Sequence, residues 1–140
     1  ALKVKNHLAA GIIFDPIKNE IFFAERNKGA YYNNQRIKVS KKNEIEECLF
    51  ATNMEGVKFS NLNMRHSGCA ALDLAYVGAG RYDGFFYNKL NIWDIAAGLL
   101  IIEEAGGVFN KVDYNMTKNI DVRASSDRIY KKMIENLENF

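Results

Sequence analysis

Residues 93–98 read Trp-Asp-Ile-Ala-Ala-Gly, and residues 99–107 continue as Leu-Leu-Ile-Ile-Glu-Glu-Ala-Gly-Gly. This run has almost no polar position before its last turn, and a helix that is apolar on nearly every face is buried. The glycines at 106 and 107 favour a helix end at that point. The segment therefore predicts a buried helix with one carboxylate, Asp94, at its start.

Asp94 is the first candidate functional residue, because a carboxylate at the edge of a core needs a partner. The residues alone favour an N-cap that accepts hydrogen bonds from the amides of Ala96 or Ala97. A metal ligand is the alternative, since Mg²⁺ binds one or two carboxylates together with water and substrate phosphate. The two roles are compatible, because a carboxylate carries several lone pairs.

Composition indicates one folded domain. The chain has 140 residues, of which 48% are hydrophobic and 26% charged, enough to close a core. A formal net charge of +2 gives no strong field for nucleic acid or acidic lipid. Two cysteines, Cys48 and Cys69, have neither disulfide nor zinc spacing, which favours a reducing cytoplasm. The longest fully apolar run, residues 99–102, is too short to cross a bilayer, so no membrane partner is expected.

Residues 1–40 alternate and turn like an antiparallel meander. The expected strands are Leu2–Lys5, Leu8–Phe14, Glu20–Glu25, Ala30–Tyr32 and Gln35–Val39. Turn signals at Asp15-Pro16 and Asn33-Asn34 separate them. Since this meander has no helix of its own, we expect one face of its sheet to be uncovered. A chain that begins inside a strand also suggests that an upstream segment is absent.

Residues 41–140 alternate strands with helices, which indicates an α/β layer arrangement that is continuous with the meander. The expected strands are Cys48–Thr52, Asp83–Tyr87, Val108–Phe109 and Ile120–Ala124. Residues 53–66 show no clear period and are expected to form a loop. A last amphipathic helix, capped by Ser126 or Asp127, is expected to run through Leu137.

The turn Ser67-Gly68-Cys69-Ala70 is the second candidate site. Ser67 is expected to cap a helix that runs from about Gly68 to Ala79. Free amides at a helix start can bind phosphate or sugar hydroxyls, although the residues alone favour simple capping and close packing. No histidine is placed convincingly near Cys69, so its thiol is interpreted as a small buried side chain and not as a nucleophile.

Together these motifs resemble the inositol monophosphatase family, and within it the bacterial extragenic-suppressor SuhB type. Residues 93–98, continuing to 104–107, are similar to the C-terminal signature of that family. Residues 68–76, Gly-Cys-Ala-Ala-Leu-Asp-Leu-Ala-Tyr, resemble its Gly-Ser/Thr-Ala-Ala helix. Residues 11–16 and 24–30 resemble the strands between its two motifs. The resemblance covers nearly the whole chain.

The resemblance implies a layered αβαβα sugar-phosphatase-like fold, of which this chain is the C-terminal portion. It implies a Mg²⁺-dependent, lithium-sensitive phosphomonoesterase, in a family whose members are usually homodimeric. Asp94 is then a catalytic metal ligand, and Gly68, Cys69 and Ala70 bind the substrate, an inositol or sugar phosphate. In the implied mechanism one Mg²⁺ activates a water for in-line attack on phosphorus, and another stabilises the leaving oxygen.

The departures from the family pattern are as informative as the resemblance. The upstream glutamate and the Asp-Pro-x-Asp-Gly-Thr motif are missing, and residues 53–66 are too short for a helix that members insert. One carboxylate cannot hold two or three Mg²⁺ ions, so the chain is expected to be inactive alone. Cys69 stands where Ser or Thr is usual. Tyr87 stands where inositol-hydrolysing members place a substrate-binding Glu, and a phenol does not replace an ionised carboxylate.

Two alternatives remain open. A shortened copy of a SuhB-type protein could be a non-catalytic interaction module that contacts RNA polymerase or transcription factors, because proteins of that type are associated with them. The uncovered face of the meander would also allow a homodimer or a swapped assembly. A weaker alternative is a phosphatase for nucleotide or sugar bisphosphates, which only Tyr87 favours.

Overall fold

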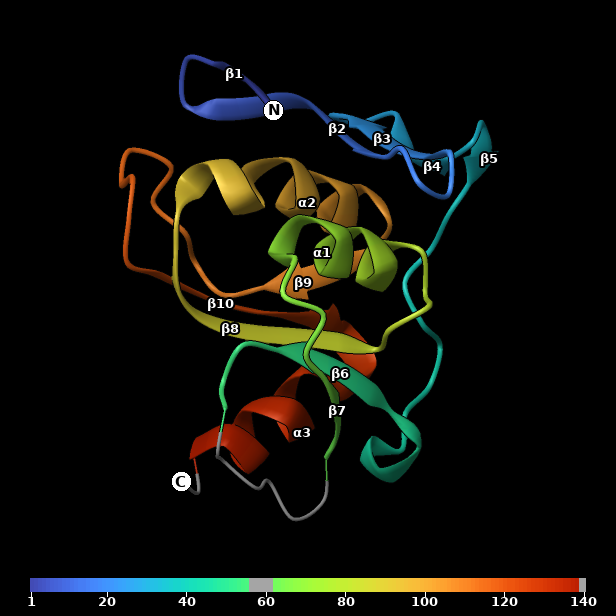
Figure 1. Cartoon of the computed structure of the whole chain (residues 1–140), viewed down its shortest axis with the longest axis vertical. Coiled ribbons are helices and arrows are strands. Elements are labelled where there is room, and N and C mark those ends of the chain that lie inside the picture. The colour runs from blue at the N-terminus through green and yellow to red at the C-terminus, as the bar shows by residue number, and fades with distance from the viewer. Residues whose placement is uncertain (56–61, 139–140) are drawn as a thin grey trace.

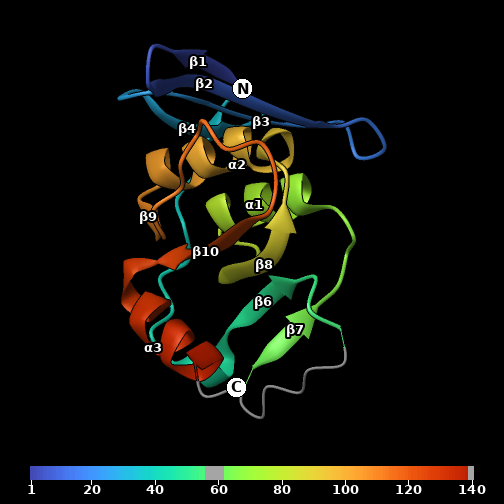
Figure 2. The ribbon, with the colours of Figure 1, turned by 90° about the vertical axis from the view of Figure 1, so that its left-hand side faces the viewer.

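Two five-stranded sheets enclose a pair of helices, and a third helix covers the far side of the second sheet (Figure 1). The computed structural model describes residues 1–55 and 62–138. In the view of Figure 2 the first sheet and α3 (Asp127–Glu138) lie at opposite ends of the molecule. The described residues thus form four consecutive layers, sheet, helices, sheet and helix, of the αβαβα arrangement expected from the sequence.

The first sheet is the antiparallel meander expected for residues 1–40, in the order β1-β2-β3-β4-β5. Its strands are β1 (Leu2–Val4), β2 (His7–Asp15), β3 (Glu20–Glu25), β4 (Gly29–Tyr32) and β5 (Gln35–Arg36). Asn19 and Asn34, with φ of 54° and 68°, occupy tight turns, because Asn enters the left-handed region more readily than most residues. β5 ends at Arg36 and not at Val39, since the Val39 amide donates to the Ala105 carbonyl instead, at 3.1 Å.

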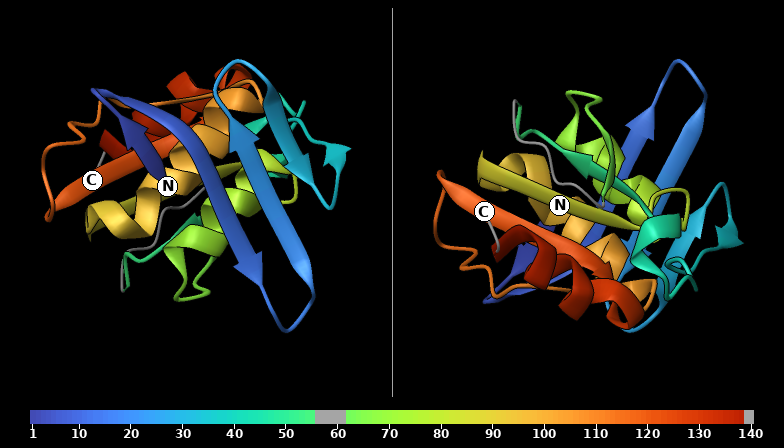
Figure 3. Two further views of the ribbon diagram at one scale, coloured as in Figure 1. Left: turned by 90° about the horizontal axis from the view of Figure 1, so that it is seen from above. Right: turned by 90° about the horizontal axis from the view of Figure 1, so that it is seen from below.

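The inner face of the first sheet packs on α1 (Ala70–Gly78) and α2 (Ile92–Glu104). Figure 3 shows its long strands crossing over these helices. Ile13 and Phe22, opposite each other on β2 and β3, are buried on this face. At Gly11 the strand comes so close to α2 that an added Cβ would lie 2.9 Å from the Cα of Ala97. The absence of a side chain at Gly11 therefore sets how closely β2 lies on α2.

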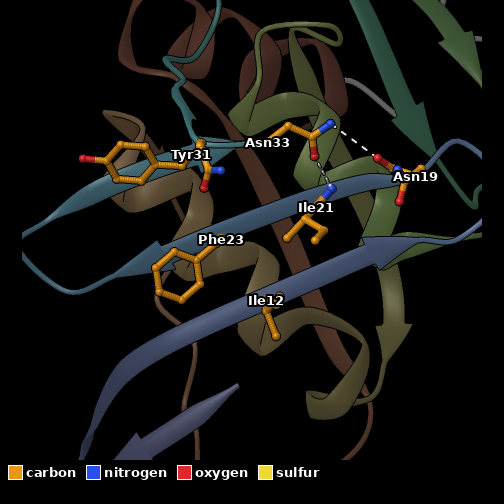
Figure 4. A pocket seen from close by; sticks show the side chains of 7 residues that line it. Ile12, Asn19, Ile21, Phe23, Tyr31 and Asn33 are labelled. Atoms are coloured by element: carbon orange, nitrogen blue, oxygen red, sulfur yellow. Dashed lines mark hydrogen bonds between the residues drawn. The ribbon is translucent and has the colours of Figure 1, made fainter.

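The outer face of the first sheet is apolar and exposed, as expected for a meander without a helix of its own. Its exposed large residues on β2 and β3 are Ile12 (58%), Phe14 (51%), Ile21 (42%) and Phe23 (37%). Ile12 lies opposite Phe23, and Phe14 lies opposite Ile21. Ile12, Ile21 and Phe23 line a hollow of about 580 Å³. Figure 4 shows how these side chains lie on the sheet. A contiguous apolar set of this kind, unlike a single exposed residue, marks a contact surface.

Replacing Ile12 and Phe23 together by threonine is expected to weaken self-association of the chain. Threonine has the branched shape that suits a strand, but it removes apolar surface that two molecules could bury. Sedimentation velocity over a range of protein concentrations measures the effect. The control is Ile13→Thr on the inner face, which should instead destabilise the fold by about 1–3 kcal/mol, because it buries a hydroxyl without a partner. Equal concentration dependence of wild type and double variant would contradict the prediction.

The second sheet is mixed, in the order β7-β6-β8-β10-β9. Its strands are β6 (Leu49–Thr52), β7 (Asn63–Arg65), β8 (Gly84–Leu90), β9 (Gly107–Phe109) and β10 (Ile120–Ser126). β6 runs parallel to β7 and β8, whereas β10 runs antiparallel to β8 and β9. β7 corrects the loop expected over residues 53–66, of which residues 56–61 lie outside the described residues. β7 has no period of its own and is a strand because β6 offers it an edge to pair with.

α2 begins at Ile92, because Asn91 takes the extended N-cap conformation, with φ −100° and ψ 150°. Asp94 therefore lies inside the first turn, and the N-cap expected at Asp94 is wrong. The rest of the expectation for this helix is confirmed, since its central residues are buried between the two sheets. These are Gly98, Leu99, Leu100, Ile101 and Ile102.

The C-terminal end of α2 is tied to the β3–β4 turn by two glutamates. Glu103 forms an ion pair with Arg26 at 3.2 Å. Glu104 accepts hydrogen bonds from the backbone amides of Asn27, at 2.8 Å, and Gly29, at 2.9 Å. These contacts compensate the unfavourable position of two acidic residues at a helix C-terminus.

α3 packs on the outer face of the second sheet, where Ile129 and Met133 join Phe50 and Phe86 in one buried cluster. Ser126 directly precedes the helix, but its buried hydroxyl has no hydrogen-bond partner, so the expected cap bond from Ser126 is not formed. Within the described ranges, no helix is both long and apolar enough to span a membrane.

Candidate functional site

The predicted site residues meet at one cavity, where the starts of α1 and α2 face the end of β8. The cavity has a volume of about 330 Å³. Its lining includes all five predicted residues, Gly68, Cys69, Ala70, Tyr87 and Asp94, together with Asn53, Ala71 and Leu90. It is smaller than the hollow on the first sheet, but it combines a carboxylate with the starts of two helices. These features make it the candidate functional site.

Asp94 presents one unengaged carboxylate oxygen at this cavity. Its Oδ2 accepts a hydrogen bond from Asn91 Nδ2 at 3.1 Å, and its backbone amide donates to the Asn91 carbonyl at 3.0 Å. Among the residues that the structure describes, no other hydrogen bond or ion pair reaches this carboxylate. The first turn of α2 also favours a negative charge through the helix dipole. Asn91 thus holds Asp94 in place while Oδ1 stays available for a ligand.

The turn before α1 places Cys69, and not Ser67, at the N-cap position, and Cys69 makes no side-chain cap bond. Ser67 Oγ instead accepts the Cys69 amide at 3.1 Å, and Gly68 has a φ of +78°, which suits glycine. The cap expected from Ser67 is therefore wrong. Cys69 is exposed, which also corrects the buried thiol expected for it. The amides in the first turn of α1 have no intrahelical partner and can donate to an anionic group.

Tyr87 contributes an uncharged wall to the cavity. Its side chain is only 3% exposed, and its ring stacks on Phe85 with 4.2 Å between ring centres and 3° between planes. Its hydroxyl donates a hydrogen bond of 2.5 Å to Asp73 Oδ2. Burial and then the neighbouring Asp73 raise the pKa of Tyr87 far above its usual value, so the phenol stays neutral. A charged acceptor is therefore absent at this wall.

Asp73, on α1, is fully buried beneath the cavity. Burial raises the pKa of its carboxyl group, and the hydrogen bonds from Tyr87 and Ser67 oppose that rise only in part. The pKa of Asp73 in the folded chain thus lies above its ordinary value of 3.8.

Asp73→Asn is expected to remove a pH dependence of stability. Between the ordinary pKa and the raised one, the folded chain keeps a proton that the unfolded chain has released, so stability falls as pH rises through this window. Asparagine does not titrate. Urea unfolding of both proteins from about pH 4 to pH 7 should show the variant gaining stability relative to wild type with rising pH. A difference that is constant with pH would show that burial does not raise the pKa of Asp73.

Asn53 is a lining residue that the sequence analysis missed. Its Nδ2 donates to the Asn88 carbonyl at 2.9 Å, and its Oδ1 accepts the Asn88 amide at 3.0 Å. These two bonds connect the end of β6 to β8. Its position in the sequence could have identified it, because polar residues that directly follow a buried strand often line a ligand site.

Asp94 fits one part of a metal site and no more. In the described part of the chain, no group of three or more His, Cys, Asp or Glu side chains could hold a metal ion. Mg²⁺ prefers carboxylate oxygens with water and substrate phosphate completing its octahedron. The unengaged Oδ1 of Asp94 suits such an ion as a single ligand. Further protein ligands for such an ion would have to come from outside the described residues.

Sequence comparison shows to which protein family this chain belongs. The model of the inositol monophosphatase family matches residues 1–139, and the chain belongs to this family. Nus factor SuhB of Haemophilus influenzae is 36% identical over 154 residues, which cover 98% of this chain and 58% of the relative. Inositol-1-monophosphatase of Caulobacter vibrioides is 32% identical, over 93% of this chain and 58% of the relative. The chain thus spans little more than half the length of these curated relatives.

Solved structures confirm the fold. The extragenic suppressor protein suhB from Bartonella henselae matches with a TM-score of 0.85 and 38% identity, over 93% of this chain and 58% of that one. An IMPase from Thermotoga maritima matches with a TM-score of 0.86 and 32% identity, over 96% of this chain and 57% of that one. The layered fold expected from the resemblance is therefore confirmed.

Proposed function

We propose that this chain is the C-terminal part of a Mg²⁺-dependent phosphomonoesterase for an inositol or sugar phosphate, and that it is inactive alone. The observation that carries the proposal is the meeting of Asp94 with the turn 68–70 at one cavity. A carboxylate with an unengaged oxygen can bind a divalent cation, and amides at a helix start can bind phosphate or alcohol oxygens. Membership of the family and a relative named inositol-1-monophosphatase support the reaction class.

In this proposal the residues of the chain bind and orient. Asp94, held by Asn91, supplies one carboxylate ligand. Mg²⁺, when bound, would supply activation of water and stabilisation of the leaving oxygen. The turn 67–70 orients the phosphate ester through amides other than that of Cys69, which donates to Ser67 Oγ, and Tyr87 bounds the alcohol side without charge. The neutral wall at Tyr87 does not favour inositol over other sugar alcohols.

A phosphate-release assay tests the proposal. The isolated chain with Mg²⁺ is expected to release no phosphate from inositol 1-phosphate. A chimera, in which the portion of a curated relative that this chain does not cover precedes residue 1, is expected to show Mg²⁺-dependent, lithium-inhibited release. Turnover by the isolated chain would contradict the inactivity. A folded chimera that hydrolyses no phosphate monoester would contradict the phosphatase assignment.

A second candidate function is a non-catalytic module that binds transcription machinery. Relatives named Nus factor SuhB favour it, and the exposed outer face of the first sheet offers apolar surface. Capture of purified RNA polymerase by the chain, unchanged by Asp94→Ala, would support this function over the phosphatase. Loss of capture with Asp94→Ala, or no capture, would leave the phosphatase as the better account.

The proposal also includes a homodimer and a cytoplasmic location. In the isolated chain the outer face of the first sheet supports self-association, because its apolar residues lie side by side on neighbouring strands. The sedimentation experiment with the Ile12 and Phe23 double variant tests the dimer. The location rests on the family resemblance and on the two cysteines.

A further inference from the structure

Asp73 is a buried acidic residue that the structure leaves incompletely satisfied. Its Oδ2 accepts two hydroxyl donors, Tyr87 at 2.5 Å and Ser67 at 2.7 Å. Its Oδ1 is buried without any hydrogen-bond partner. No ion pair among the described residues includes this carboxylate. A carboxyl group in this state costs stability that an apolar side chain on the same helix would not cost.

The two donors that Asp73 binds belong to opposite parts of the candidate site. Ser67 Oγ donates to Asp73 and also accepts the Cys69 amide at 3.1 Å, so Asp73 is connected to the turn before α1. Tyr87 comes from β8, where its ring is already fixed against Phe85. Both Cys69 and Tyr87 line the cavity that contains Asp94. One buried oxygen therefore joins the two elements that bound the site.

We propose that Asp73 is a positioning residue of this cavity: its Oδ2 holds the turn 67–70 and Tyr87 in a fixed relation around Asp94. The purpose of this arrangement rests on the proposed function, in which the turn binds the phosphate ester. The coupling of the turn 67–70 to Tyr87 through Asp73 does not rest on the proposed function, because it is a property of the folded chain that is measurable without substrate. Tyr87 then acts on the turn chiefly through Asp73, to which its hydroxyl donates, although Ser67 also lies close to that hydroxyl.

Amide hydrogen exchange at Cys69 measures the coupling, and the thiol of Cys48 reports whether each variant stays folded. The Cys69 amide is protected by Ser67 Oγ, which Asp73 holds. Cys48 is fully buried, and burial raises the pKa of its thiol to about 11, so a thiol reagent reaches it only when the chain opens. Asp83→Asn is the matched control, because Asp83 is a second buried aspartate that binds Lys42 and the Leu49 amide instead.

Asp73→Ala is expected to speed Cys69 exchange about fivefold or more while Cys48 stays protected. Asp73→Asn should retain slow exchange, because the amide oxygen still accepts both hydroxyls. Tyr87→Phe should speed exchange at Cys69, and its effect should be smaller in the Asp73→Ala background.

Two results would overturn the positioning role. One is Cys69 exchange that is unchanged in Asp73→Ala with Cys48 protected. The other is equal effects of Tyr87→Phe with and without Asp73. If Asp73→Ala exposes Cys48, Tyr87→Phe and Asp73→Asn test the positioning role instead, since both variants nearly keep the volume of the core. Faster Cys69 exchange in Tyr87→Phe with slow exchange in Asp73→Asn would support the role, and unchanged exchange in Tyr87→Phe would overturn it. A chimera without phosphatase activity would overturn the proposed function and leave this coupling untouched.

Discussion

Gly98→Val is expected to destabilise the chain by about 3 kcal/mol, the upper part of the range for overpacked cores. Gly98 lies where α2 crosses α1, and a Cβ added there would lie 2.5 Å from the Cβ of Leu74 and 2.8 Å from its Cδ1. Leu74 is fully buried, and the nearest of the three atoms is its own Cβ, which cannot move away by a change of rotamer. The two helices therefore have to separate. Because domains are stable by only about 5–15 kcal/mol, a large fraction of the variant should unfold in mild urea.

Urea titration followed by circular dichroism measures this effect. Trp93→Val is the control, since Trp93 lies on the same helix but is 64% exposed. A surface change of this kind is expected to shift the free energy of unfolding by about 0.5 kcal/mol or less. A Gly98→Val protein with the wild-type urea midpoint would contradict the close packing of α1 on α2.

The buried helix and the meander were predictable because each follows from a local pattern. The continuous apolar run of residues 99–102 could only be buried, and alternation in β2 and β3 placed Ile13 and Phe22 on one face and Ile12 and Phe23 on the other. β7 was not predictable in this way. Its residues form a strand through pairing with β6, and such pairing leaves no period in the sequence.

The helix starts were wrong for a related reason. Asp94 and Ser67 are both good capping residues, but Asn91 and Cys69 occupy the cap positions. The chain enters α2 directly from β8, which moves the helix start forward of Asp94. Capping preference ranks side chains at the N-cap position, but it does not determine at which residue the helix begins.

The lining of the cavity was predictable only in part. The resemblance identified all five predicted residues on the lining, although it does not establish their roles. Asn53 on the lining and Asp73 beneath it were not found. In the sequence Asp73 is one polar residue between Leu72 and Leu74 on a helix, and nothing there shows that it is buried or that Tyr87 and Ser67 share its oxygen.

Asp94→Asn in the active chimera is expected to lower phosphate release on the order of 100-fold or more, since even residues that only support a metal ligand cost 10–100-fold when removed. Asparagine keeps the size of Asp94 and can still accept the hydrogen bond from Asn91. It loses the charge that attracts Mg²⁺. A higher Mg²⁺ concentration should therefore restore part of the phosphate release. It would not restore release if the variant had lost its fold.

Asp113→Asn is the matched control, because Asp113 is an exposed aspartate away from the cavity whose Oδ1 accepts only the Asn115 amide. It should leave both phosphate release and its Mg²⁺ dependence unchanged. Urea midpoints within error of wild type for both variants would show that the effect of Asp94→Asn is on the site. An Asp94→Asn chimera with wild-type release at low Mg²⁺ would exclude Asp94 as a ligand, because an uncharged amide oxygen binds Mg²⁺ far more weakly than a carboxylate.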